Sequence, residues 1–306
     1  MSGQGEDKVT SWFAQQSRAR EERFPIGIGD DMAQVNMGGG SVLVTTDMLL
    51  DGVHFDLASA GAEQVGYKAM AASLSDCAAM ATRPVCAVVA VALPTGFGED
   101  KLKELHAGIV RAGDMFDCTL IGGDITAWRD NAGRFVINVT MLSECVDCVE
   151  PVKRSGAKVG DAVCVTGELG GSIAGKHLTF VPRVEEAIEI ARAADVHAMM
   201  DVTDGLVKDL SRICAASGVG AIIEAERVPM THAAKEGNDP LEAALYDGED
   251  FELLFTVSAE DYETLAGEQS IKAGITRVGL ITDSGRIELQ RGRDREVLDV
   301  KGYDHL

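Results

Sequence analysis

Residues 62–92, AEQVGYKAMAASLSDCAAMATRPVCAVVAVA, hold the pattern that decides the fold of the first half of the chain. The alanine-rich part predicts a helix over about 62–82, and the apolar run after the proline predicts a strand over 85–92. Outward from this unit we expect a strand at 42–46, a helix at about 99–116, and strands at 118–121 and 134–143. Strands and helices mix here without a strict strand–helix–strand alternation, which indicates an α+β fold rather than a dinucleotide-binding sheet.

The second half follows the segment CVEPVKRSGAKVGD, which combines proline, glycine and charged residues. We place a domain boundary there, near Glu150, so the predicted domains are residues 1–150 and 151–306. Strands are expected at 162–167, 198–202, 221–225, 251–257 and 276–281, with helices covering roughly 171–194 and 205–217. Both halves are therefore compatible with an α+β plan.

The charge of the chain limits its partners. With 28 Lys and Arg against 49 Asp and Glu, the net charge is −21, which disfavours nucleic acid and anionic membrane surfaces. An acidic protein still binds a phosphorylated substrate when metal ions stand between its carboxylates and the phosphates. The first 25 residues lack an apolar core segment, so we expect no signal peptide. Seven cysteines, mainly in apolar runs, suit reduced thiols and a cytoplasmic protein.

Aspartates recur beside glycine or at the ends of predicted strands. They lie in GIGDD (27–31), TTD (45–47), SD (75–76), GGD (122–124), DVTDG (201–205) and GED (248–250). Each has a simpler interpretation as a turn residue or helix cap, and Asp204 before GLVKDL is one example. Asp47 after an apolar run and Asp76 inside an apolar helix fit that interpretation poorly, because a lone buried carboxylate is destabilising unless it is paired or binds metal.

The types of side chain in these motifs indicate which metal they suit. Carboxylates with neighbouring hydroxyls, such as Thr45 and Thr46, are the oxygen ligands that Mg²⁺ prefers. Cys145 and Cys148 form a single CxxC without a second pair at ligand spacing, so a structural zinc is disfavoured.

Phosphate-binding candidates do not follow the usual motifs, since GxxxxGK[ST] and the protein-kinase catalytic loop are both missing. VTGELGGS at 165–172 is either a phosphate-binding loop or a plain tight turn. Arg154 lies beside a flexible turn, where it either meets a phosphate or is simply solvated. His54 follows Asp47 closely enough to reach the same cleft, although a lone histidine is more often structural.

Eight motifs in order resemble the thiamine-monophosphate kinases, which belong to the aminoimidazole ribonucleotide synthetase superfamily. They are GIGDDMA, TTDMLLDGVHF, VGYKAMAASLSDCAAMATRP, LIGGDIT, RSGAKVGDAVCVTGELG, the PR of FVPRVEE, DVTDGLVKDLSRI and GEDFELLF. The resemblance runs from about Phe24 to Phe255, with a weaker echo in the closing GYDHL. It implies an α+β N-terminal domain whose sheet pairs with that of a second subunit, an α/β C-terminal domain, and ATP held between them by Mg²⁺.

The resemblance also implies roles for individual residues. The implied metal ligands are Asp31, Thr45, Thr46, Asp47, Asp76, Asp124, Asp201 and Asp204, with Asp30 as the alternative to Asp31. The implied ATP contacts are Gly123, Asp124, Arg154 and Thr203, and the residues that would face thiamine monophosphate are His54, Glu249 and Tyr303.

Some positions depart from the family pattern. Thr203 stands where serine is usual, DGVHF replaces EGVHF, and Tyr303 replaces a Trp or Phe. The stretch from Gly171 to Asp201 is shorter than in most relatives and lacks their long insert, which bears on the acceptor pocket.

These observations predict direct in-line transfer of the ATP γ-phosphoryl group to thiamine monophosphate, with no protein nucleophile. One alternative keeps ATP but uses another acceptor, such as an amide, a carboxamide or selenide. The chain ends YDHL rather than in cysteine, and its first cysteine is Cys77, which disfavours the hydrogenase-maturation and selenophosphate branches. A second alternative is a non-catalytic binding or scaffold protein, which the retained acidic positions disfavour.

Overall fold

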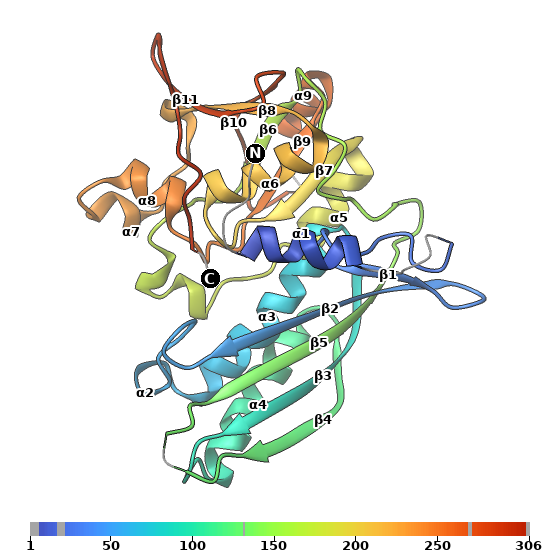
Figure 1. The fold of residues 1–306 in the computed structure, drawn as a ribbon, viewed down its shortest axis with the longest axis vertical. Helices are drawn as coiled ribbons and strands as arrows, with labels where there is room; N and C mark the ends of the chain where they lie inside the picture. The colour runs from blue at the N-terminus through green and yellow to red at the C-terminus, as the bar shows by residue number, and fades with distance from the viewer. Residues whose placement is uncertain (1–5, 17–21, 131, 269–270, 304–306) are drawn as a thin grey trace.

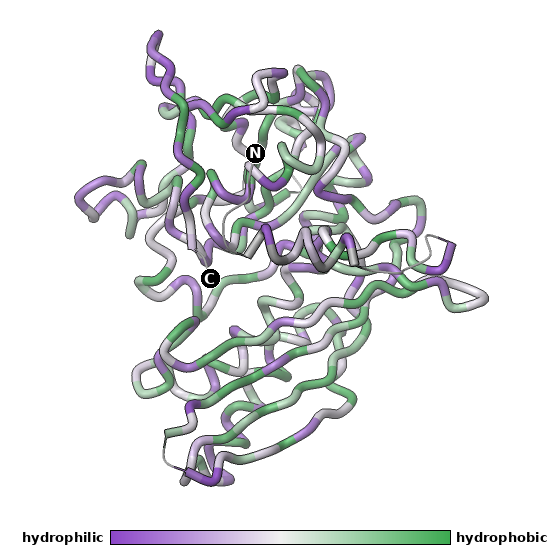
Figure 2. The backbone as a smooth tube through the Cα atoms, in the orientation of Figure 1, coloured by the Kyte–Doolittle hydropathy of each residue, from purple (hydrophilic) through white to green (hydrophobic). Residues whose placement is uncertain are grey.

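The computed structural model describes residues 6–16, 22–130, 132–268 and 271–303. The closing motif GYDHL is thus described only as far as Tyr303. In the described chain the strands form two sheets, one from each half of the sequence (Figure 1). Figure 2 shows that hydrophobic residues recur along the strands of both sheets.

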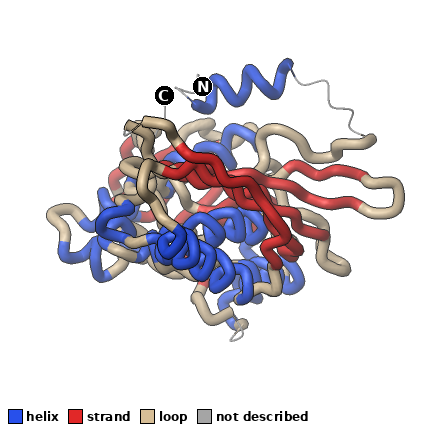
Figure 3. The backbone as a smooth tube through the Cα atoms, turned by 90° about the horizontal axis from the view of Figure 1, so that it is seen from below, coloured by secondary structure: helices blue, strands red, loops and turns tan. Residues whose placement is uncertain are grey.

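The first sheet has the strand order β1-β2-β5-β3-β4. Its strands are β1 (Ala33–Asn36), β2 (Ser41–Leu50), β3 (Arg83–Leu93), β4 (Thr119–Ala127) and β5 (Val136–Glu144), and only β3 and β4 run parallel. The accompanying helices are α1 (Glu6–Gln16), α2 (Leu57–Ala60), α3 (Ala62–Ala79) and α4 (Glu99–Asp114). Helices α3 and α4 cover one face of this sheet, while α1 lies apart on the other side (Figure 3). The sheet therefore has one covered and one open face.

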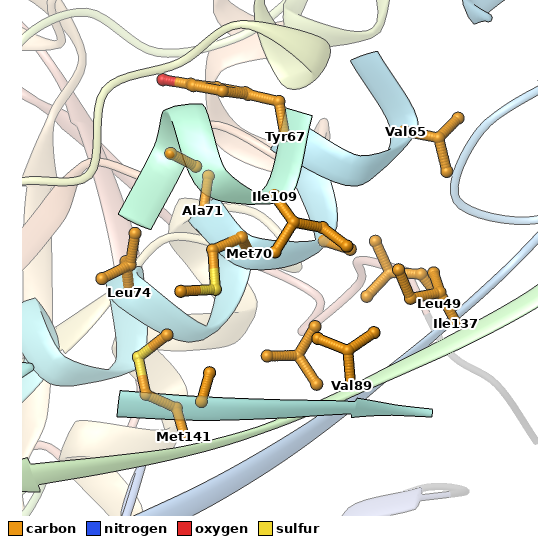
Figure 4. Close-up of a cluster of buried hydrophobic side chains, with 14 of the residues drawn as sticks. Leu49, Val65, Tyr67, Met70, Ala71, Leu74, Val89, Ile109, Ile137 and Met141 are labelled. Carbon is orange, nitrogen blue, oxygen red and sulfur yellow. The ribbon is translucent and has the colours of Figure 1, made fainter. Parts of the chain in front are cut away.

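Helix α3 is the central element of the molecule. Fourteen of its eighteen residues are buried, so it is enclosed on all sides rather than amphipathic. Gly66 and Gly108 let it approach α4 closely, since a Cβ on Gly108 would lie 1.9 Å from the Glu63 carbonyl oxygen. Figure 4 shows its apolar side chains, among them Met70 and Leu74, packed against residues of the sheet. The polar residues of α3 that face the second domain are thereby held in place.

The second sheet is mixed, with the order β12-β11-β8-β10-β6-β9-β7. Its strands are β6 (Ala162–Thr166), β7 (Val196–Asp201), β8 (Gly220–Glu224), β9 (Leu253–Val257), β10 (Ile275–Thr282), β11 (Ile287–Arg291) and β12 (Asp294–Val297), and only β8 and β11 run parallel. The helices are α5 (Val184–Ala193), α6 (Leu206–Ser217), α7 (His232–Glu236), α8 (Pro240–Tyr246) and α9 (Ala259–Gly267), with 3₁₀ turns η1 (Ser172–Ala174), η2 (Lys176–Leu178) and η3 (Ala225–Arg227).

Two predicted elements need correction. The helices expected over 171–194 form only from Val184, because two short 3₁₀ turns joined at Gly175 take up the preceding segment. The strand expected at 118–121 continues as β4 to Ala127, since pairing with β3 extends it through two glycines. The division into residues 1–150 and 151–306 remains a proposal, and Glu150 lies between β5 and β6. None of the helices in the described residues has the length and apolar content needed to cross a bilayer.

Candidate active site between the two domains

A cavity of about 940 Å³ lies between the two halves of the chain. Most of the residues singled out from the sequence line it, and they come from both halves. They are Asp30, Asp31, Thr45, Thr46, Asp47, His54, Asp76, Arg154, Asp201, Thr203, Asp204, Glu249 and Tyr303. Thr10 of α1, which no motif indicated, also lines this cavity. We refer to it below as the interdomain cavity.

Three carboxylates that line the interdomain cavity lie close together. One oxygen each from Asp31, Asp76 and Asp201 lies within 4.8 Å of the other two. Asp31 precedes β1, Asp76 projects from α3 and Asp201 ends β7, so three distant segments converge. Hydroxyl groups orient two of them, because Thr45 donates to Asp76 and Ser75 donates to Asp201. We call these three residues the carboxylate cluster.

The carboxylate cluster is electrostatically unfavourable without a cation. Burial raises the pKa of Asp76 well above its usual range, and the nearby charges of Asp47, Asp201 and Asp31 raise it further. Burial followed by the charge of Asp31 raises the pKa of Asp201 to about 8. Burial also raises the pKa of Asp47, although a hydrogen bond of 2.7 Å from the Ser73 hydroxyl opposes this. Oxygen donors that are buried and repel one another are the arrangement in which a divalent cation binds.

Arg154 connects the carboxylate cluster to the segment at the start of the second half. Its Nε and Nη2 atoms donate to the two oxygens of Asp31 at 3.0 and 2.8 Å, so the guanidinium binds this carboxylate through both atoms. Asp30 instead accepts the Arg154 backbone N–H at 2.8 Å. Of the two neighbouring aspartates, the structure therefore brings Asp31 into the cluster and uses Asp30 to hold the Arg154 backbone.

Asp204 lies at the edge of the interdomain cavity in a network that the sequence did not indicate. It contacts Arg212 at 2.7 Å, and Arg212 also contacts Asp209 at 2.7 Å. Asp209 accepts the backbone N–H groups of Thr203 and Asp204, and burial raises its pKa to about 6. The interpretation of Asp204 as a helix cap is wrong, because Gly205 occupies the N-cap position of α6. The three-residue spacing of Asp209 and Arg212 on one helix was the available signal.

Two of the three residues expected to face the acceptor, His54 and Glu249, contact a buried lysine, Lys68. The backbone N–H of Leu50 donates to His54 Nδ1 at 3.1 Å, which fixes the orientation of the imidazole ring. Tyr303 is about half exposed, and its backbone N–H donates to the Asp204 carbonyl at 3.3 Å. Glu249 contacts Lys68, which lines the same cavity and was missed in the sequence because its partner lies 181 positions away.

The Gly-rich turn at 165–172 is a tight turn rather than a phosphate-binding loop. Its amides are already occupied by the chain's own carboxylates, since Gly170 N–H donates to both Asp250 oxygens and Gly171 N–H donates to Asp247. The Ser172 hydroxyl also donates to Asp250.

Gly123 and Asp124 do not line the interdomain cavity. In the sheet, Met48, Asn138, Ala90 and Asp124 are successive register partners, so they share one face. Asp47 is adjacent to Met48 and points to the opposite, helix-covered face, where it meets Ser73. Three strand spacings also separate β2 from β4, about 14 Å. A single chain therefore does not bring Asp124 to the carboxylate cluster.

A second cavity, of about 430 Å³, lies between α4 and β4 and is lined by Gly123 and Asp124 together with apolar residues such as Val89, Leu102 and Ile109. It shares no lining residue with the interdomain cavity. The residues implied to contact ATP are therefore divided between two places in one chain.

The chain has two α+β domains with a carboxylate-lined cavity between them. Comparison with known families identifies the class of protein that has this arrangement. Residues 29–145 match the AIR synthase related protein N-terminal domain, and residues 158–292 match the corresponding C-terminal domain. The protein is thus a two-domain member of the AIR synthase related class.

The more particular family follows from individual relatives. The chain is 39% identical to the thiamine-monophosphate kinase of Rhodopirellula baltica over 282 residues, covering 86% of each chain. It is 36% identical to the thiamine-monophosphate kinase of Methanospirillum hungatei over 288 residues, covering 90% of this chain and 92% of the relative. The solved structure of AaThiL complexed with AMPPCP and TMP superimposes with a TM-score of 0.83 at 28% identity, covering 99% of this chain and 97% of that one. The chain belongs to the thiamine-monophosphate kinase family.

Proposed function

We propose that this protein transfers the γ-phosphoryl group of ATP to the phosphate of thiamine monophosphate, yielding thiamine diphosphate and ADP. The observation that carries this proposal is the carboxylate cluster in the interdomain cavity, within a chain that matches its relatives over most of its length. The structural relative AaThiL was solved with AMPPCP, an ATP analogue, and with TMP, so both reactant types are accommodated on this fold.

We infer that Mg²⁺ is the metal. The donors are oxygen atoms, and burial together with neighbouring negative charges raises the pKa of Asp47, Asp76 and Asp201, which supports binding of a cation among them. The residues that would hold it are Asp31, Asp47, Asp76 and Asp201, with Thr45, Thr46 and Asp204 lining the same cavity. When bound, Mg²⁺ would neutralise negative charge on the transferred phosphoryl group.

The chain's own cations and polar residues position the two reactants. Arg154 is held by Asp31 beside Thr203, and we assign both to the nucleotide phosphates because they line the cavity next to the carboxylate cluster. His54, Glu249 and Tyr303 line the same cavity, and we assign them to thiamine monophosphate. Transfer between two phosphates needs alignment and charge neutralisation rather than a protein nucleophile.

We further infer that the protein acts as a homodimer formed through the open face of the first sheet. Met48 and Ile121 are 57% and 62% exposed on the strands of that sheet. Large exposed apolar side chains on an open sheet face are typical of a protein–protein interface. Asp124 lies on the same open face, so a second copy packed there would bury it in the interface, and we infer that it acts in the site of the partner.

The compartment is inferred from the cysteines and the charge. All seven cysteines, which lie among the described residues, are free thiols, as is usual in the reducing cytoplasm. The net charge of −21 suits a small-molecule substrate rather than nucleic acid or a membrane surface.

The reaction is tested by measuring ADP and thiamine diphosphate with ATP, Mg²⁺ and either thiamine monophosphate, thiamine or no acceptor. We expect both products only with thiamine monophosphate, and a loss of at least about 100-fold in turnover for Asp76→Asn with an unchanged circular dichroism spectrum. Asp299→Asn, on an exposed side chain, is the control and should retain full activity. Turnover with thiamine alone, or full activity in Asp76→Asn, would contradict the proposal.

The dimer is tested by mixing two inactive variants, Asp76→Asn and Asp124→Asn. If Asp124 acts in the site of the partner, a hybrid dimer has one site with both substitutions and one intact site. Random mixing then restores about a quarter of wild-type activity, because half of the dimers are hybrids. No recovery in isolated hybrid dimers would show that Asp124 acts within its own chain.

A further inference from the structure

Lys68 is an unusual residue for the centre of a buried helix. It projects from α3, and none of its surface is exposed, although lysine is almost never fully buried unless it is paired. Its Nζ atom lies 2.5 Å from Glu249 Oε2 and donates to the His54 carbonyl oxygen at 2.5 Å. Lys68 therefore joins two segments of the interdomain cavity, one from each half of the chain.

The segment that carries Glu249 has a strained backbone. Glu249 and Phe251 have φ values of +68° and +51°, in the left-handed region that side chains rarely adopt. Such conformations persist only where several contacts hold them, and they are concentrated at functional sites. Here Glu249 N–H donates to the Thr203 carbonyl at 2.8 Å, and Phe251 N–H donates to the Val202 carbonyl at 2.9 Å.

The side chains of this segment point in alternate directions. Asp250 is turned towards the Gly170 amide, and Phe251 stacks on Phe180 with ring centroids 3.9 Å apart. Glu249 and Phe251 both line the interdomain cavity, and the Glu249 carboxylate contacts Lys68 there. Asp250 and Phe251 hold the segment in place, and the Lys68 ammonium group forms an ion pair with the Glu249 carboxylate.

The charge of Lys68 matters as much as its position. A phosphorylated acceptor entering the cavity beside an uncompensated Glu249 would meet a like charge, which is unfavourable in a buried site. Lys68 neutralises that glutamate, while burial lowers the pKa of the lysine and the charge of Glu249 opposes this. The pair therefore presents an oriented oxygen acceptor without adding net negative charge.

We propose that Lys68 is a positioning residue for the acceptor: it orients Glu249 and the His54 segment and cancels the charge of Glu249 next to the phosphorylated substrate. This inference rests on the function proposed above. It predicts an effect on the acceptor that is separate from the effect on ATP, because Lys68 contacts the Glu249 side chain and the His54 carbonyl, whereas the bond between Glu249 and the nucleotide residue Thr203 joins their backbones.

The test compares Lys68→Met, Lys68→Arg, Glu249→Gln and the double variant Lys68→Met/Glu249→Gln in steady-state assays with either reactant varied. Lys68→Met should raise the KM for thiamine monophosphate at least about tenfold, equivalent to about 1.4 kcal/mol, and leave the KM for ATP within about twofold. Lys68→Arg keeps the charge and should recover part of the loss. The double variant should be no worse than Lys68→Met alone, because both changes remove the same pair.

Lys176→Met is the matched control. Lys176 also pairs with a buried glutamate, Glu252, at 2.9 Å, but neither residue lines the interdomain cavity. It should lower the melting temperature without changing either KM. A Lys68→Met enzyme with an unchanged acceptor KM, equal changes in both KM values, or additive effects in the double variant would each overturn the inference. If wild-type protein itself shows no turnover with thiamine monophosphate, the proposed function fails instead, so the two failures are distinguishable.

Discussion

The pKa of Asp201 leads to a quantitative prediction for the metal-free protein. Asp201 is 2% exposed and has a pKa of about 8, raised first by burial and then by the charge of Asp31. An unfolded aspartate has a pKa of about 3.9, so between pH 5 and 7 the folded chain binds one more proton here than the unfolded chain. The contribution of Asp201 to the free energy of unfolding is fully present below about pH 4 and is lost as the pH rises towards 8. The free energy of unfolding should fall by roughly 2–3 kcal/mol between pH 5 and 7 from Asp201 alone.

This change is large enough to measure by calorimetry. Unfolding entropy is about 2.1 cal/mol/K per residue, or about 0.64 kcal/mol/K for this chain, so the contribution of Asp201 corresponds to about 4 °C in Tm. In EDTA, wild-type protein should therefore melt lower at pH 7 than at pH 5. Asp201→Asn should remove about 4 °C of that difference. Asp209 and Asp250 each have a pKa of about 6. They therefore lower the Tm further between pH 5 and 7, and they do so equally in wild type and in Asp201→Asn.

Two comparisons complete this experiment. Asp299→Asn, an exposed control, should keep the wild-type pH dependence, and added Mg²⁺ at pH 7 should raise the Tm of wild type more than that of Asp201→Asn. The reasoning would be refuted if Asp201→Asn retained the full wild-type slope between pH 5 and 7, or if metal-free wild type became more stable over that range.

Three further predictions concern other parts of the molecule. Arg154→Lys should lower kcat/KM for ATP at least about tenfold, because an ammonium group cannot form both bonds to Asp31; wild-type kinetics would contradict this. Met48→Glu should shift the protein to monomer in sedimentation velocity and abolish turnover, since it places a charge on the open sheet face; an active dimer would rule out that interface. Gly108→Ala should lower Tm by about 2–5 °C, because its Cβ would meet the α3 backbone, whereas Gly267→Ala, with open space around it, should be neutral in the same thermal melts.

Local patterns in the sequence were sufficient to predict most of the helices and strands of the fold. Helix α3, strand β3 and helix α6 were expected close to their observed bounds, because helix and strand periodicity is expressed within a few residues. Helix α1, the short helices after β8, α9 and the strands β1, β11 and β12 were not expected. They are short or weakly periodic, so their stability depends on packing rather than on local pattern.

The buried charges show where local reasoning stops. Few basic residues stand near the aspartates in sequence, yet Arg154 pairs with Asp31 from 123 positions away. Ser75, which donates to Asp201, and Glu249, which pairs with Lys68, both lie in motifs, but no motif indicated these pairings, because contact across such distances depends on how two domains pack. A motif in the sequence shows that a carboxylate is present. The charge state of that carboxylate depends on neighbouring groups, which only the folded structure brings together.

The sequence by itself therefore determined the class of fold and the chemical type of the site, because these depend on residue type and short spacing, and its resemblance to a known family indicated thirteen of the residues that line the cavity. Only the tertiary structure decided that Asp31 rather than Asp30 joins the carboxylate cluster, and that the Gly-rich turn binds carboxylates of the chain. It also placed Asp124 on the face of the sheet opposite Asp47. The physical reason is that strand register and domain packing set which side chains meet, and both are long-range properties of the folded chain.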